Sequence, residues 1–203
     1  MTTNWGGTFV EQGYALLPGF LDVKQTEQLT ELLNRHLDEG SPSRIVANDD
    51  VSICRSILSR DEQVARIVSG LGAPFDVLKD ASRLLRDEVT LKHSDSSREY
   101  PWHQDEVVTQ DPSLLTVTLW LTPAGPDEGT LELIPGSHRR GAQSHVEQTG
   151  KIMLAADDQL FSQAIQPRVE AGTASIFHRH IIHRGMPNRS GRSVMSYVFM
   201  MKH

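Results

Sequence analysis

The feature that most constrains the fold is a change in the hydrophobic pattern near residue 88. From there onward the apolar runs are short and rich in valine, isoleucine, threonine and aromatic residues, which favour β-strands. These runs are 89–91, 114–121, 130–134, 173–177 and 193–200. Proline and glycine separate them, as in the segments 122–126 and 134–137, and both residues mark turns. The later part of the chain therefore predicts an antiparallel sandwich or barrel.

The earlier part of the chain has helical periodicity instead. Residues 22–40 predict a helix, and Asp22 and Gln25 have the spacing of a capping box at its start. Its apolar stripe consists of Leu29, Leu32, Leu33 and Leu37. A second helix is expected over 61–71, before a glycine and a proline end it. Helices first and strands afterwards predict a mainly β fold of the α+β class, with the helices on the outside of the β core.

Length and charge limit the class of protein. A chain of 203 residues is expected to form one domain, residues 1–203. Its formal net charge of −6 disfavours binding to nucleic acid or to anionic lipid. No apolar run approaches the ~18 residues that a membrane span needs, and Cys54 is the only cysteine, so a soluble cytoplasmic protein is expected. Two polar segments, 41–56 and 139–166, are expected to be mobile loops over a site, with a helix as the alternative for part of the second segment.

The nine histidines raise the question of a metal site. Four are followed two residues later by an acid: His36, His93, His103 and His145. The first lies in the predicted helix, where residues two apart do not share a face, and is expected to be structural. The second opens a polar turn, and the fourth lies in the polar 139–166 segment. His103 and Asp105 follow an extended Tyr-Pro-Trp segment that suits a strand edge, so this pair is the best candidate.

A third ligand must come from elsewhere in the chain. The cluster of His178, His180 and His183 is the one dense source of imidazoles downstream. Two histidines and one carboxylate form the facial triad of non-haem Fe(II) oxygenases. The spacing alone leaves open which of the three binds, or whether the cluster is half-exposed sheet surface.

Four blocks in order resemble one protein family. Residues 8–21 resemble its opening strand, Pro101-Trp-His-Gln-Asp105 its iron motif, 129–139 its glycine and proline turn, and 183–190 the segment with its second iron histidine. The chain is thus similar, from residue 8 to about 200, to the phytanoyl-CoA dioxygenase family of iron(II) and 2-oxoglutarate dependent oxygenases. The resemblance implies a double-stranded β-helix, the jelly-roll or cupin-like core. It also implies that His103, Asp105 and His183 hold the iron and that His178 and His180 do not.

The family binds the far carboxylate of 2-oxoglutarate with a basic residue shortly after the second histidine. Arg192 is expected here, with Arg189 and Arg184 as alternatives, although many members place the arginine two residues later, where this chain has Val194. A shift of two residues keeps strand parity, and a guanidinium pairs with a carboxylate at two points. Lys92 resembles a lysine that some relatives place on the strand before the iron motif, although a lysine at such a position is more often solvated. Three residues that share one strand face, Thr116, Thr118 and Trp120, are expected to line the cofactor pocket, with a place in the core as the alternative for Trp120.

The implied activity is oxidation of a small polar metabolite by dioxygen, with release of succinate and carbon dioxide. Halogenating relatives lack the carboxylate that this chain keeps at Asp105, so hydroxylation, desaturation or oxidative cyclisation is expected, with natural-product biosynthesis as one setting. A monomer or small homo-oligomer is expected. If the acidic loop residues line the entrance, the substrate is cationic; these are Asp49, Asp50, Asp157 and Asp158.

Two other classes of protein use the same residues. A redox-inert isomerase or hydrolase of the cupin type would bind zinc at the same triad and would need neither 2-oxoglutarate nor Arg192. A non-catalytic jelly roll that binds a small ligand would keep its affinity after loss of the metal.

Overall fold

The computed structural model of the chain describes residues 5–38, 41, 43–47, 50–105, 111, 113–148, 151–155 and 157–203. Its helices are α1 (Trp5–Gln12), α2 (Val23–Leu37), α3 (Glu62–Ser69) and α4 (Asp158–Phe161). The strands before residue 110 are β1 (Tyr14–Leu17), β2 (Arg44–Ala47), β3 (Val51–Arg55), β4 (Leu84–Lys92) and β5 (Tyr100–His103). The later strands are β6 (Leu114–Trp120), β7 (Leu131–Leu133), β8 (His145–Gln148), β9 (Lys151–Leu154), β10 (Ala174–His178), β11 (His183–Gly185) and β12 (Val194–Lys202).

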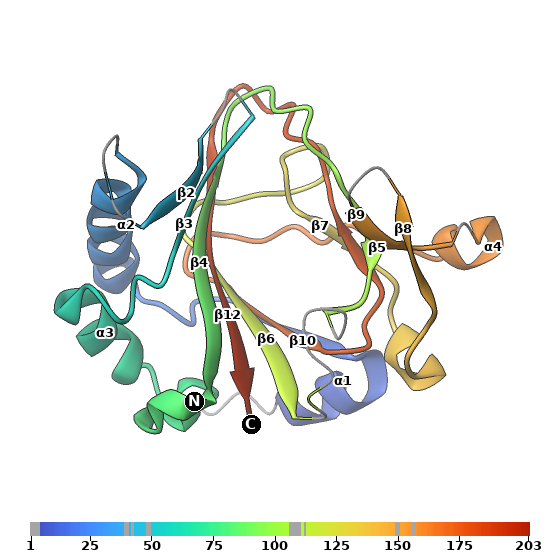
Figure 1. Cartoon of the computed structure of the whole chain (residues 1–203), viewed down its shortest axis with the longest axis horizontal. Coiled ribbons are helices and arrows are strands. Elements are labelled where there is room, and N and C mark those ends of the chain that lie inside the picture. The colour runs from blue at the N-terminus through green and yellow to red at the C-terminus, as the bar shows by residue number, and fades with distance from the viewer. Residues whose placement is uncertain are drawn as a thin grey trace.

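The strands form two sheets that face each other and a separate hairpin (Figure 1). The large sheet has the order β1-β10-β6-β12-β4-β3-β2, the small sheet the order β5-β11-β7, and β8 pairs with β9. Neighbouring strands are antiparallel, and most neighbours are far apart in sequence, as in β12 beside both β4 and β6. This is the mainly β jelly-roll core with flanking helices that the sequence predicts.

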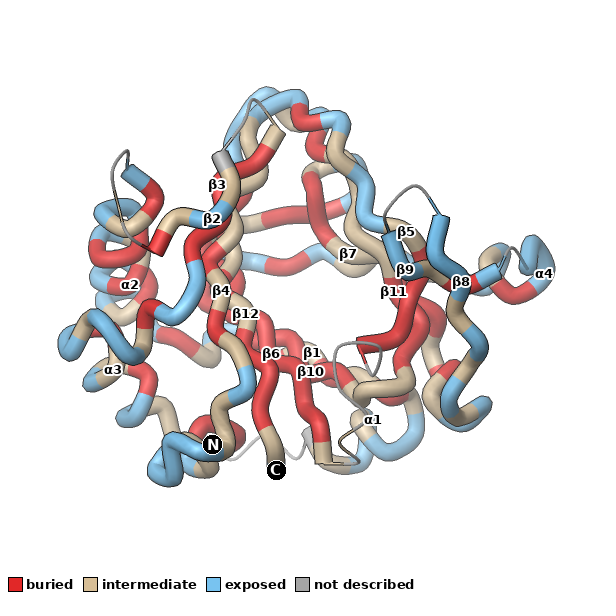
Figure 2. The backbone as a smooth tube through the Cα atoms, viewed as in Figure 1, coloured by how far each residue is buried: buried red, intermediate tan, exposed pale blue. Residues whose placement is uncertain are grey.

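The large sheet has two different faces because successive side chains of a strand point to opposite sides. On β6, Val117 and Leu119 are fully buried on the face that packs against the helices. Thr116, Thr118 and Trp120 lie on the other face, toward the small sheet. One apolar cluster joins the outer face of the sheet to leucines of α2 and valines of α3. Figure 2 shows the consequence: buried residues in the central strands and exposed residues on the outer sides of α2 and α3.

Both predicted helices form, with the predicted cap on the first. The Asp22 carboxylate accepts a hydrogen bond from the Gln25 amide at 2.7 Å, and the Gln25 side chain accepts one from the Asp22 amide at 3.0 Å. Asp61 caps α3 by accepting from the backbone amides of Gln63 and Val64. His36 Nε2 lies 3.0 Å from the Asp61 carboxylate and so links α2 to α3. This contact agrees with the expectation that His36 is structural.

Three segments differ from expectation. The N-terminal block expected as a strand contains α1 followed by the short strand β1, and a positive φ of 77° at Gly13 allows the turn between them. The segment 41–56, expected as a loop, contains β2 and β3. β3 pairs with β4 in the large sheet, and Val51 and Cys54 of β3 are both buried. In the segment 139–166 the β8–β9 hairpin was not expected, whereas α4 agrees with the helix allowed for part of this segment. Among the described residues, no helix combines the length and the apolar character that crossing a bilayer requires.

Candidate active site

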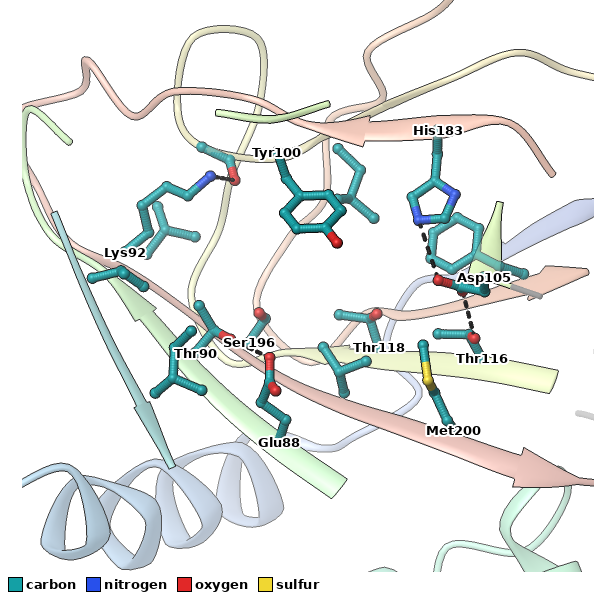
Figure 3. Close-up of a pocket in the computed structure, with 18 of the residues that line it drawn as sticks. Glu88, Thr90, Lys92, Tyr100, Asp105, Thr116, Thr118, His183, Ser196 and Met200 are labelled. Atoms are coloured by element: carbon teal, nitrogen blue, oxygen red, sulfur yellow. Dashed lines mark hydrogen bonds and ion pairs between the residues drawn. The ribbon is translucent and has the colours of Figure 1, made fainter. Parts of the chain in front are cut away.

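Three side chains converge on one point between the two sheets. His103 ends β5 and His183 begins β11, and the antiparallel register places these two residues directly opposite each other. The Asp105 Oδ1 atom lies 3.7 Å from His103 Nε2 and 3.8 Å from His183 Nε2. All three residues are buried, and their ligand atoms lie within 4.8 Å of one another. Figure 3 shows His183 pointing toward Asp105. In the part of the chain that the structure describes, this is the one such group of metal-ligating residues.

The hydrogen bonds of the two imidazoles fix which nitrogen is available. His103 Nδ1 is 2.9 Å from the carbonyl oxygen of Pro101, and His183 Nδ1 is 3.1 Å from that of Ile181. Because a carbonyl oxygen only accepts, each Nδ1 must carry the proton. Each Nε2 therefore presents its lone pair toward Asp105, which is the tautomer that a metal-binding histidine needs.

The electrostatics keep these groups in the ligand state. Burial opposes ionisation of Asp105, but His183, His103 and the Thr116 hydroxyl outweigh it and keep the pKa of this carboxyl below its usual value. The Thr116 hydroxyl donates to Asp105 Oδ2 at 2.6 Å, so Oδ1 remains for a metal. Burial and the neighbouring His103 lower the pKa of His183 to about 4, so this imidazole is neutral at pH 7. One carboxylate and two imidazoles on one side of a point, with the other side open, fit a divalent iron ion.

Gln104 holds the turn between the first two members of the triad. It is fully buried, and its amide nitrogen donates to the carbonyl oxygens of Gly141 and His180 at 3.0 and 2.8 Å. Its side-chain oxygen accepts from the Gln143 amide, and its own backbone amide donates to His145 Nε2. His145 therefore lies in strand β8 as a support for the triad and outside the group of ligands. The sequence pattern does not predict this role, because it depends on contacts with distant parts of the chain.

A cavity of about 300 Å³ extends from the triad between the two sheets. The floor of the cavity is the inner face of the large sheet. Lining residues that lie opposite one another on neighbouring strands form rows across this floor. One row contains Arg86, Met200 and Thr116, and the last row on β4 contains Val51, Lys92 and Val194. Its roof includes Tyr100 and Leu131 of the small sheet. In Figure 3 the Tyr100 ring lies between Lys92 and His183.

Thr116, Thr118 and Trp120, which were expected to line the cofactor pocket, all line this cavity. The Trp120 indole N–H donates to the Ser175 hydroxyl at 2.7 Å, which fixes the ring. Lys92 also lines the cavity, and its ammonium donates to the carbonyl oxygens of Met186 and Gly129. Burial and the nearby Arg98 lower the pKa of Lys92 to about 8.

Arg192 does not lie where the sequence led us to expect. Its guanidinium is on the outer surface, 2.9 Å from the Glu128 carboxylate, and it does not line the cavity. The reason is local: residues 190–192 form a bend, and β12 begins only at Val194, so strand parity does not extend back to Arg192. Neither alternative lines the cavity either. Arg184 pairs with Glu132 and Glu99 and lies over the Trp102 ring, and Arg189 is outside the lining set.

The described acidic residues considered for a cationic substrate do not line the cavity. Asp50 accepts hydrogen bonds from the Ser97 amide and hydroxyl, and Asp157 caps α4 through the Leu160 amide. Asp50, Asp157 and Asp158 are not lining residues, and Asp49 falls outside the described residues. His178 and His180 are likewise outside the triad, as the family resemblance implies.

The inner face of β4 carries cavity-lining residues that were not predicted from the sequence. Arg86, Glu88 and Thr90 line the cavity together with Lys92 and alternate with the buried Asp87 and Val89. The alternation was a usable signal for a half-buried strand, but a run of charged residues on one face is equally typical of a solvated sheet surface. Only the second sheet, placed over this face, makes it an interior surface.

Comparison with known proteins agrees with the fold. The family model described as "Phytanoyl-CoA dioxygenase (PhyH)" matches residues 9–195. An L-proline trans-4-hydroxylase from Streptomyces griseoviridis is 24% identical over 217 residues, which cover 89% of this chain and 78% of the relative.

Two solved structures are similar in fold. The epimerase SnoN in complex with Fe3+, alpha ketoglutarate and nogalamycin RO has a TM-score of 0.78 and 17% identity, over 98% of this chain and 82% of that one. EctD from S. alaskensis with 2-oxoglutarate and 5-hydroxyectoine has a TM-score of 0.76 and 15% identity, over 100% and 76% of the two chains. With a family model that spans nearly the whole length, the chain belongs to the phytanoyl-CoA dioxygenase family.

Proposed function

We propose that the protein is an Fe(II)- and 2-oxoglutarate-dependent dioxygenase that oxidises a small polar metabolite. The observation that carries this proposal is the position of the triad. Two imidazoles and one carboxylate meet at the wall of a cavity that also contains a half-buried cation, Lys92. A metal bound to the triad and a dianionic co-substrate are both accommodated by this arrangement. The family, the hydroxylase relative and the two similar structures support the same chemistry.

His103, Asp105 and His183 would hold the iron. When bound together, the iron and 2-oxoglutarate supply the oxidation of a substrate C–H bond by dioxygen, with 2-oxoglutarate converted to succinate and carbon dioxide. The carbonyl groups of Pro101 and Ile181 hold the two imidazoles in the ligand tautomer. Thr116 holds the Asp105 carboxylate so that one oxygen faces the metal. Because Asp105 keeps this place, we expect hydroxylation, desaturation or cyclisation, with no halide at the metal.

Lys92, in place of Arg192, would bind the far carboxylate of 2-oxoglutarate. Its ammonium contacts the carbonyl of Met186, a residue three positions after His183, and three residues of strand span about 10 Å. The far end of a five-carbon dicarboxylate held at the metal falls within this range. Thr118 and Trp120 line the same cavity and would bound the co-substrate from the floor.

The small cavity favours a small substrate. A volume of about 300 Å³ must contain both 2-oxoglutarate and the reacting part of the substrate. An amino acid, a sugar or a biosynthetic intermediate of similar size fits better than a long acyl thioester. We further expect residues 1–203 to act as one domain, as a monomer or small homo-oligomer in the cytoplasm.

The test is spectroscopic and needs no substrate. Metal-free protein is given Fe(II) and then 2-oxoglutarate without oxygen, and the visible charge-transfer band between iron and the keto acid is recorded. The band is expected in the unmodified protein and absent from His103→Ala, whose folding is checked by circular dichroism. A protein that binds Fe(II) without giving the band on addition of 2-oxoglutarate would contradict the proposal and favour the redox-inert metal enzyme.

A further inference from the structure

We infer that Arg86 forms a second anion site in the cavity and that the substrate carries a carboxylate which binds there. This inference rests on the proposed function and names the substrate class of the same site. It concerns the end of the cavity nearest to the triad and differs from the cationic substrate considered from the acidic loops.

The strand register places Arg86 in the same cross-strand row as Thr116, the residue that hydrogen-bonds Asp105 of the triad. Arg86 of β4 is opposite Met200 of β12, and Met200 is opposite Thr116 of β6, whose hydroxyl binds Asp105. Adjacent strands are about 4.8 Å apart, so the backbones of Arg86 and Thr116 are roughly 10 Å apart. The arginine side chain lines the cavity and is long enough to present its guanidinium beside the open face of the triad.

Arg86 has no compensating partner among the described residues. Its Nε atom is buried without a hydrogen-bond acceptor, and its side chain makes no ion pair there. The nearest inward acid on the same strand, Glu88, is engaged by Arg55 at 2.5 Å and by the Thr90 hydroxyl at 3.5 Å. The Arg86 side chain is half-buried, and its Nε–H is shut off from solvent without an acceptor; this is unfavourable, and an anionic ligand in the cavity would supply the missing acceptor.

2-Oxoglutarate cannot supply that anion if it occupies the Lys92 end. Arg86 and Lys92 are six residues apart on the same face of β4, a separation of about 20 Å along the strand. A five-carbon molecule with one end at the metal and the other at Lys92 leaves Arg86 free. Because the cavity is continuous, the remaining anion is that of the substrate, and a guanidinium binds a carboxylate at two points.

The test measures binding of propionate, a simple carboxylate, to protein loaded with Fe(II) and saturating 2-oxoglutarate without oxygen. Propionate labelled with ¹³C at the carboxyl carbon reports proximity to the paramagnetic iron through enhanced relaxation. Arg86→Gln is expected to weaken propionate binding by about tenfold or more. Arg86→Lys keeps the charge without the two-point geometry, so its effect should be smaller. The exposed Arg60→Gln is the matched control and should bind like the unmodified protein, and propionamide should not bind.

The absorption band, recorded in the same samples, separates the two proposals. A normal band with equal propionate binding in Arg86→Gln and unmodified protein would overturn the inference and leave the proposed function intact. So would a normal band without relaxation enhancement in the unmodified protein, or a band lost on adding propionate, since the anion would then occupy the 2-oxoglutarate site. Absence of the band in the unmodified protein before propionate is added would overturn the proposed function, and the inference with it.

Discussion

Lys92 lies directly opposite Val194 in the antiparallel register of β4 and β12. Val194 stands where many relatives have the arginine that binds 2-oxoglutarate, so the cation of this chain is on the neighbouring strand, at the same level of the cavity. Both side chains line the cavity, whereas Arg192 pairs with Glu128 outside it. Our proposal is that Lys92 supplies, from the neighbouring strand, the charge that the sequence led us to expect from Arg192.

Removal of this cation should weaken binding of 2-oxoglutarate. Lys92→Met is expected to raise the dissociation constant by about 10-fold to 100-fold, because a hydrogen bond to a charged group contributes about 1.5–3 kcal/mol. The constant is read from the anaerobic absorption band as 2-oxoglutarate is added. Lys92→Arg should stay closer to the unmodified protein.

A second substitution tests whether the register explains the effect. In the Lys92→Met background, Val194→Arg returns a cation to the same level of the cavity from the opposite strand, and affinity for 2-oxoglutarate should partly recover. Arg192→Ala should leave the affinity within about twofold of the unmodified value, since exposed ion pairs have little effect. A large loss in Arg192→Ala with none in Lys92→Met would show that Arg192, and not Lys92, binds the carboxylate.

Binding of 2-oxoglutarate should also depend on pH through Lys92. Burial and the nearby Arg98 lower the pKa of Lys92 to about 8 in the free protein, while Glu99 and Asp50 act in the opposite direction. The charged form binds the carboxylate, so affinity should be constant below pH 8 and fall by up to about tenfold for each pH unit above it. Dissociation constants between about pH 6.5 and 9.5 test this, with Lys92→Arg as the control whose affinity should not fall. Equal slopes in the two proteins would assign the pH dependence to another group.

The turn that carries the triad should depend on Gln104. Gln104→Leu removes the hydrogen bonds that hold this turn to Gly141, His180 and Gln143. Loss of a group that orients metal ligands typically weakens metal binding by about 10-fold to 100-fold. Competition with a metal chelator measures this affinity, and the exposed Gln163→Leu serves as the control. Unchanged affinity in a folded Gln104→Leu protein would show that the ligands are held by their own strands alone.

The parts of this site that the sequence predicts are those encoded locally. Pro101-Trp-His-Gln-Asp105 is a continuous segment, so its extended start and the separation of the two ligands can be predicted from adjacent residues. The capping box of Asp22 and Gln25 and the alternation of Thr116, Thr118 and Trp120 are local in the same way. These features need no knowledge of the tertiary structure.

The parts that could not be predicted depend on where a strand begins or on what covers it. Parity predicts that Arg192 and Val194 share a face only if both are in one strand, and the bend at 190–192 removes Arg192 from it. The charged side chains of β4 have the pattern of a solvated surface until a second sheet covers them. β2 and β3 are short and polar in part, so their pairing with the sheet edge decides their structure more than their own sequence does.

The last prediction concerns stability on the opposite face of β4. Asp87 is buried there, and its Oδ2 atom accepts hydrogen bonds from the Ile57 amide at 2.7 Å, the Leu58 amide at 3.2 Å and the Tyr197 hydroxyl at 2.9 Å. Burial and Asp87 raise the pKa of Tyr197, so its hydroxyl remains a donor.

Asp87→Ala leaves these three donors without an acceptor, at about 1–3 kcal/mol for each unsatisfied group, so the free energy of unfolding in urea should fall by at least about 3 kcal/mol. Tyr197→Phe removes only one donor and should cost about 1 kcal/mol. Because Asp87 faces away from the cavity, the fraction of Asp87→Ala protein that is still folded should bind 2-oxoglutarate with nearly normal affinity. If the loss in Asp87→Ala were no larger than in Tyr197→Phe, the backbone amides of the segment before α3 would have found other acceptors, and Asp87 would not be what ties that segment to the sheet.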